Sequence, residues 1–122
     1  PICTKPPSVA RSLFRLMWAT RFLYILMLEL DVAFQNPKGA VTLRMCVSTA
    51  YECALAEHHG WAVRKGVAAA LYLLPSKEHF LEKLGVDLRR RDEYLERIQR
   101  SLKPLIDEMY RFYGEKDLLT LP

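Results

Sequence analysis

The apolar residues of the chain recur every three or four positions, the period of an α-helix, and no segment alternates apolar and polar residues as a half-buried strand does. Proline, glycine and helix-capping residues divide this pattern into segments. The sequence therefore predicts an all-α fold. We expect about five helices, running from about Ser8 to Leu30, Val41 to His58, Trp61 to Leu74, Ser76 to Gly85 and Arg89 to Tyr113.

The first of these helices is apolar on most sides, so we expect it to be central and packed from several directions. A loop is predicted over 31–40, which contains an Asn-Pro-Lys-Gly run. Pro104 lies inside the last helix and predicts a kink there, because proline has no backbone N–H to donate. The apolar tail at 118–122 is expected to pack back on the core.

Composition and charge narrow the class of protein. The 122 residues suit one domain, and three cysteines without a disulfide spacing indicate reduced thiols in the cytosol. No signal peptide is visible, and the longest uncharged run, Phe22–Leu28, is far shorter than the ~20 residues of a membrane span. The net charge of +4 permits an anionic partner, but no basic run is interleaved with aromatic residues as in nucleic-acid platforms. We expect peripheral contact with membranes and no nucleic-acid binding.

Arg11 and Arg15 are one helical turn apart, and the same helix face continues through Trp18, Phe22 and Leu26. Two guanidinium groups can grip phosphate oxygens in bidentate fashion, above a face that becomes aromatic and then aliphatic. This arrangement suits a ligand with an anionic head and an apolar body. The same spacing also fits two solvated arginines above ordinary core residues.

The His-His-Gly-Trp motif at 58–61 is the second candidate. A histidine at a helix end can donate a hydrogen bond to a bound polar group, although a lone histidine is often structural. Trp61, followed by Arg64 and Lys65, fits an anchor at an anionic membrane surface and equally an ordinary core residue.

Other chemistry is not indicated. Cys46, Cys53, His58 and His59 match no zinc-site spacing, so no metal and no other cofactor is expected. The chain has no Gly-rich phosphate loop, no nucleophile elbow and no recognisable arrangement of nucleophile and base, so we do not expect an enzyme.

The stretch from Tyr51 to Trp61 reads Tyr-x7-His-Gly-Trp, and Pro75 follows with Phe80-Leu81 five residues further on. Together with the leucine-rich first helix and tail, these motifs resemble the glycolipid transfer protein family over nearly the whole chain. The resemblance implies a two-layer helical sandwich that holds one sphingolipid, with its headgroup at the surface and its chains in an apolar pocket between the layers. Members of the family carry lipid between membranes and catalyse no bond chemistry.

The resemblance also assigns residues. Arg11 and Arg15 match the arginine pair of the branch that binds ceramide 1-phosphate rather than a sugar, and His59 matches the histidine that bonds the ceramide amide. Trp61 matches a tryptophan implicated in docking to the bilayer, beside Arg64 and Lys65. The expected lining of the chain pocket, to which we add Leu26 from the arginine face, is Phe22, Leu26, Tyr51, Leu55, Val67, Leu71, Phe80 and Leu84.

One departure concerns the family's earlier helices. The family places an Asp and a Lys of the headgroup site there, and nothing before Ser8 matches them. We expect residues 1–122 to form one domain of this type without the N-terminal helices, either because the sequence is truncated or because another chain supplies the missing layer. The leading hypothesis is a carrier of ceramide 1-phosphate, with an unknown oligomeric state. The alternative is a helical interaction or lipid-sensing module, derived from the carrier fold, without transfer activity.

Overall fold

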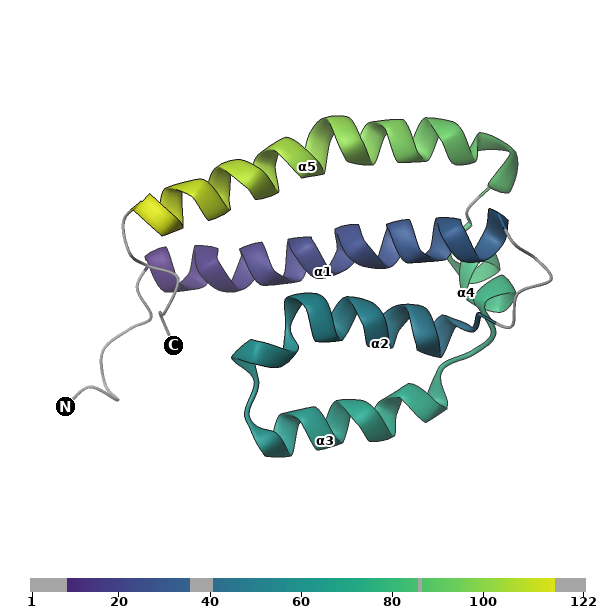
Figure 1. Cartoon of the computed structure of the whole chain (residues 1–122). Helices are drawn as coiled ribbons and strands as arrows, with labels where there is room; N and C mark the ends of the chain where they lie inside the picture. The colour runs from purple at the N-terminus through teal and green to yellow at the C-terminus, as the bar shows by residue number, and fades with distance from the viewer. Residues whose placement is uncertain (1–8, 36–40, 86, 116–122) are drawn as a thin grey trace.

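Figure 1 shows a computed structural model of the chain, which describes residues 9–35, 41–85 and 87–115. The expectations for the end of the loop at 36–40 and for the tail at 118–122 lie outside these residues. The all-α class predicted from the sequence is confirmed. The described residues form five α-helices: α1 (Val9–Gln35), α2 (Leu43–Ala54), α3 (Trp61–Ala70), α4 (Lys77–Leu84) and α5 (Arg91–Glu115).

Three short 3₁₀ turns join these helices: η2 (Ala56–His58), η3 (Leu71–Leu73) and η4 (Leu88–Arg90). Two of them correct the expected helix ends, because the second helix stops at Ala54 rather than His58 and the third at Ala70 rather than Leu74. The fourth helix has the expected ends. Its Ser76 hydroxyl accepts the backbone N–H of His79 at 3.2 Å, and Gly85 follows in the left-handed conformation, with φ of 71°.

Helix α1 is five residues longer than predicted and ends at Gln35. The segment after Leu30 was expected to be a loop, but Gln35 donates a hydrogen bond back to the Asp31 carboxylate at 2.8 Å, one turn earlier. Ala33 is buried against α2, which adds packing to this last turn. The proline that stops helices follows only at 37.

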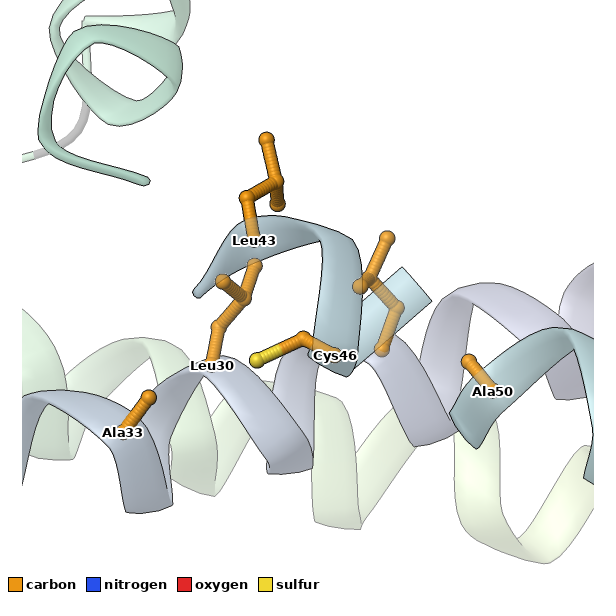
Figure 2. Packing of buried hydrophobic residues seen from close by; sticks show 6 residues of the cluster. Leu30, Ala33, Leu43, Cys46 and Ala50 are labelled. Atoms are coloured by element: carbon orange, nitrogen blue, oxygen red, sulfur yellow. The ribbon is translucent and has the colours of Figure 1, made fainter. Parts of the chain in front are cut away.

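The central position expected for α1 is confirmed, because it lies between α2 and α5 (Figure 1). Its contact with α2 is a tight cluster of small and medium apolar side chains, and Figure 2 shows the Cys46 thiol pointing toward Leu30. Burial raises the pKa of that thiol above its usual value, which keeps it protonated and unreactive. The buried members are Leu26, Leu30 and Ala33 of α1 with Leu43, Cys46 and Ala50 of α2.

The expectation that α1 is packed from several directions is only partly met. A third face of the helix carries exposed apolar side chains, two of which, Leu23 and Met27, also border a pocket shared with α4 and α5. Its positions are spaced by three and four residues, so they form one stripe along the helix. The stripe consists of Val9, Leu13, Leu16, Leu23 and Met27, which are between 43% and 76% exposed.

Candidate functional site

The two arginines of the predicted headgroup site lie in the first two turns of α1. Arg15 is exposed, whereas Arg11 is half-buried and the Nε atom of its guanidinium is buried. With a rise of about 1.5 Å per residue, the two Cα atoms are separated by about 6 Å along the helix axis. This is a spacing from which two guanidinium groups can contact one phosphate.

An aromatic cluster follows Arg15 by one turn. The Trp18 indole and the His58 imidazole stack with ring centroids 3.7 Å apart and planes 6° apart. Phe14 packs edge-on against both rings and stacks on Tyr113 of α5 with centroids 5.1 Å apart. The cluster therefore joins η2 and α5 to the arginine-bearing end of α1.

Sequence reasoning did not find the role of His58. The histidine belonged to the singled-out motif, but its partner Trp18 is distant in sequence, so no local pattern pairs them. Burial against the rings lowers the pKa of the His58 imidazole, and the Glu57 carboxylate, 3.2 Å from its Nε2 atom, opposes that shift. The ring is thus neutral at neutral pH. This suits a face-to-face stack on an indole, because burying a neutral imidazole costs less desolvation than burying a charged one.

His59 is held by Tyr51 of α2. The Tyr51 hydroxyl lies 2.7 Å from the Nδ1 atom of His59, and burial raises the pKa of that hydroxyl, so it stays protonated. When the hydroxyl donates to Nδ1, the ring carries its proton on Nε2 and presents a donor. His59 follows directly after His58, whose ring stacks on Trp18 of the helix that carries Arg15.

Arg21 ties the same end of the molecule together. Its Nη1 atom donates a 3.0 Å hydrogen bond to the backbone carbonyl of Cys53, near the end of α2. Its guanidinium also lies over the Tyr110 ring of α5, 5.4 Å from the ring centroid. One side chain of α1 therefore contacts both neighbouring helices directly beyond the aromatic cluster.

An apolar pocket of about 560 Å³ opens further along α1, between α1, α4 and α5. This volume lies in the range of small-ligand pockets. Its nearest α1 residue, Leu23, is eight residues beyond Arg15, which is about 12 Å along the helix axis. A molecule reaching from the arginines into the pocket would therefore need a long apolar part. The pocket is lined by Leu23, Leu26, Met27, Leu30, Asp31, Phe34, Phe80, Leu81, Leu84, Arg91, Tyr94, Leu95, Arg97 and Ile98.

Three residues of the expected chain pocket, Leu26, Phe80 and Leu84, line this cavity. The other five lie elsewhere. Phe22 packs half-buried on the α1–α2 cluster, and Tyr51 is buried beside His59. Leu55 packs half-buried on the aromatic cluster, whereas Val67 and Leu71 are half-buried positions of α3 and η3.

The α5 side of the pocket was missed by sequence reasoning. Leu95 and Ile98 follow the helical spacing that predicted α5, but that spacing does not say which helix they face. They meet α1 through an antiparallel pairing of two helices far apart in the chain. Only the packed structure shows that these two helices, so far apart in the sequence, lie side by side.

The predicted membrane-docking residues lie on α3, which has no buried side chain. Trp61 is the first residue of this helix and is 75% exposed. Arg64 forms an ion pair with Glu52 of α2 at 3.5 Å, and Lys65 is exposed beside it. No helix in the described ranges is long and apolar enough to cross a membrane.

The described helices and the apolar pocket between α1, α4 and α5 define the chain as an all-helical protein with an apolar cavity. Residues 2–86 match the family model described as Glycolipid transfer protein. The chain belongs to the glycolipid transfer protein family, as the motifs around Tyr51 and Trp61 predicted.

Individual relatives support the same assignment. The ceramide-1-phosphate transfer protein of Mus musculus is 35% identical over 121 residues, which cover 96% of this chain and 53% of that protein. The apo-form structure of the mouse ceramide-1-phosphate transfer protein matches with a TM-score of 0.80 and 29% identity, over 96% of this chain and 55% of that one. A mutant of Arabidopsis accelerated-cell-death 11, complexed with C12 ceramide-1-phosphate, matches with a TM-score of 0.77 and 27% identity. The match covers 88% of this chain and 52% of that one.

The chain thus spans about half the length of the relatives it matches. The family fold predicted from the sequence is confirmed by these matches.

Proposed function

We propose that the chain binds a sphingolipid with an anionic headgroup, ceramide 1-phosphate, and carries it between membranes without making or breaking bonds. The observation that supports the proposal is that one helix carries both the arginine pair and one side of the apolar pocket. Its first turns hold Arg11 and Arg15, and its later turns, from Leu23 onward, line an apolar pocket. One rigid element would thus position a phosphate and a hydrocarbon chain relative to each other.

Each part of the lipid has a physical counterpart in the proposal. The two guanidinium groups pair with the phosphate, and the Nε2 donor of His59 orients the amide. A hydrocarbon chain fills the pocket, where each buried methylene contributes about 0.8 kcal/mol. Ceramide 1-phosphate bound to accelerated-cell-death 11 supports the choice of ligand. The earlier helices of the family, outside this chain's match, would complete the headgroup site.

Docking at membranes is assigned to α3. The exposed Trp61 indole suits the interface between headgroups and acyl chains, and Arg64 and Lys65 would face anionic lipid. The chain would then work in the cytosol and bind membranes transiently.

Transfer of labelled ceramide 1-phosphate between vesicles tests this function. A charge-assisted hydrogen bond is worth about 1.5–3 kcal/mol, so Arg15→Ala should weaken lipid binding by roughly 10- to 100-fold. Arg100→Ala is the matched control, because Arg100 is an exposed arginine of α5 paired with Glu96 in its own helix. Equal transfer by the Arg15→Ala variant and the parent would refute the headgroup assignment.

A second function is favoured by the N-terminal part of the exposed stripe of α1, from Val9 to Leu16, which lies outside the apolar pocket. An apolar face of this kind suits a protein partner, and the chain would then be an interaction module without transfer activity. Native mass spectrometry of the purified chain separates the two. A co-purified lipid supports the carrier, whereas a protein partner or a homodimer without lipid supports the module.

A further inference from the structure

Helix α5 is attached to the rest of the molecule in two different ways. Its buried residues, Ile106 and Tyr113, both lie in the C-terminal half. The Tyr113 hydroxyl also donates a hydrogen bond to the backbone carbonyl of Ala10, and its ring stacks on Phe14. By contrast, the half that begins at Arg91 contains no buried residue before Ile106. The C-terminal half is thus anchored in the core, and the N-terminal half is not.

Pro104 stands at the junction of these halves. A proline inside a helix removes the hydrogen bond from its own nitrogen to the carbonyl four residues earlier, which here belongs to Arg100. The helix is continuous through this position and bows along its length in Figure 1. The missing bond makes the junction the place where α5 bends most easily.

The unanchored half forms one wall of the apolar pocket. Tyr94, Leu95 and Ile98 line the pocket from α5, opposite Leu23 and Met27 of α1. These side chains border open volume instead of interlocking with α1. Moving this half of α5 away from α1 would therefore break fewer apolar contacts than moving the half that holds Tyr113.

Polar contacts hold the wall to α1 at both ends of the pocket. At one end the Nε atom of Arg91 lies 2.9 Å from the Oδ1 atom of Asp31, whose side chain is only 11% exposed. Toward the other end the Tyr24 hydroxyl donates to the Oε1 atom of Gln99 at 2.9 Å. The Arg91 Nε and Asp31 Oδ1 atoms are buried and are not aligned as a hydrogen bond, so this ion pair restrains the wall by charge attraction.

We propose that residues 91–103 of α5 are a movable wall of the pocket, hinged at Pro104 and latched to α1 by Arg91 and Asp31. The wall swings outward to let a hydrocarbon chain enter sideways and closes over it. The assignment of the chain as the ligand rests on the proposed function, whereas the hinge and the latch rest on the attachment of α5 alone.

Distances between spin labels on the lipid-free chain test the motion. One label pair, Ala19→Cys with Glu96→Cys, reports the wall against α1, and a second pair, Ser12→Cys with Glu108→Cys, reports the anchored half. All four positions are exposed. The native cysteines are first replaced, with serine at the exposed Cys53 and at residue 3 and with alanine at the buried position 46.

Arg91→Gln should broaden the wall distances toward longer values and leave the anchored pair unchanged. Its matched control is Arg90→Gln, because the neighbouring Arg90 pairs with Glu93 within the same helix start and not with α1. Pro104→Ala restores a backbone donor and should narrow the wall distribution. Unchanged wall distances in both Arg91→Gln and Pro104→Ala, or equal broadening at both label pairs, would overturn the proposal.

A second arm adds vesicles containing ceramide 1-phosphate. Longer wall distances on addition, with faster lipid uptake by Arg91→Gln, support both the wall and its ligand. If Arg91→Gln lengthens the wall distances without lipid, and adding lipid changes no distance, the result supports the wall and counts against the proposed function. Lipid binding with wall distances that never change counts against the wall and leaves the carrier function standing.

Discussion

The imidazole of His58 lies flat against the indole of Trp18, with ring centroids 3.7 Å apart and planes tilted by only 6°. This contact joins the turn that precedes the His-Gly-Trp motif to the helix that carries the arginine pair. It places an ionisable ring among apolar ones, with 15% of its side chain exposed. The protonation state of His58 is therefore coupled to the packing of the aromatic cluster.

We predict that His58 makes stability depend on pH below about 6.5, the ordinary pKa of histidine. Burial lowers the pKa of His58 in the folded chain, so the unfolded chain takes up this proton first as the pH falls. The contribution is full above the unfolded pKa and is lost as the pH falls through the lower folded pKa. Urea unfolding between pH 5 and 7.5 measures it.

His58→Phe isolates the pH-dependent contribution of His58 to stability, because phenylalanine keeps a stacked ring but does not titrate. The variant should lose part of the stability difference between pH 5 and 7.5 that the parent shows. His79→Gln is the control, since His79 is exposed on α4, and it should keep the parent's pH dependence. A His58→Phe variant with the parent's full pH dependence would exclude His58 as the titrating group.

Phe14 should be among the residues whose truncation costs most stability. It is 1% exposed and contacts the rings of Trp18, His58 and Tyr113. Phe14→Ala should lower the free energy of unfolding by about 3–5 kcal/mol through lost burial and the cavity left behind. Phe112→Ala, at a 48% exposed position of α5, should cost less than about 1 kcal/mol. Similar losses in the two variants would contradict the cluster's place in the core.

The helices could be predicted from the sequence because local signals mark their ends. Ser76 and Gly85 cap α4 through contacts with residues a turn away, so their effect is visible in a short window. The last turn of α1 was missed because Asp31 and Gln35 look like loop residues in isolation. Their hydrogen bond to each other and the burial of Ala33 against α2 extend the helix.

The site could be predicted only as far as its motifs are local. Arg11 and Arg15 share a helix face, so their spacing made them candidates, whereas the assignment of His59 came from the resemblance of its motif to the family. The pocket arises where α5 runs beside α1, and no periodicity reveals which of two apolar helix faces meets which. The Trp18–His58 stack was invisible for the same reason.

Two glycines should respond to alanine in opposite directions. Gly66 lies inside α3, where an added Cβ atom meets nothing within 4 Å, so Gly66→Ala should stabilise that helix by about 0.5–1 kcal/mol. Gly85 has φ of 71°, so Gly85→Ala should destabilise the end of α4 by about 1–2 kcal/mol. Amide hydrogen exchange within 61–70 and 77–84 should slow in the first variant and quicken in the second. Changes of the same sign would contradict the assigned conformations.

Tyr51 should act on lipid binding through His59. Tyr51→Phe removes the hydroxyl 2.7 Å from the Nδ1 atom, which frees the imidazole to take either tautomer and to rotate. The lost hydrogen bond should lower the free energy of unfolding by only about 0.5–1.5 kcal/mol, because the ring stays in place. Binding of ceramide 1-phosphate should weaken by roughly 2- to 10-fold, since the donor to the amide is no longer held.

The comparison with two further variants decides whether Tyr51 positions His59 or only packs. If it positions the histidine, Tyr51→Phe should have little effect in a His59→Ala background, so the two losses of affinity do not add. Tyr72→Phe removes an exposed hydroxyl of η3, outside the pocket, and should leave the affinity for ceramide 1-phosphate unchanged. Additive losses from Tyr51→Phe and His59→Ala would show that the two side chains contribute independently, and the hydrogen bond between them would then have no part in holding the donor.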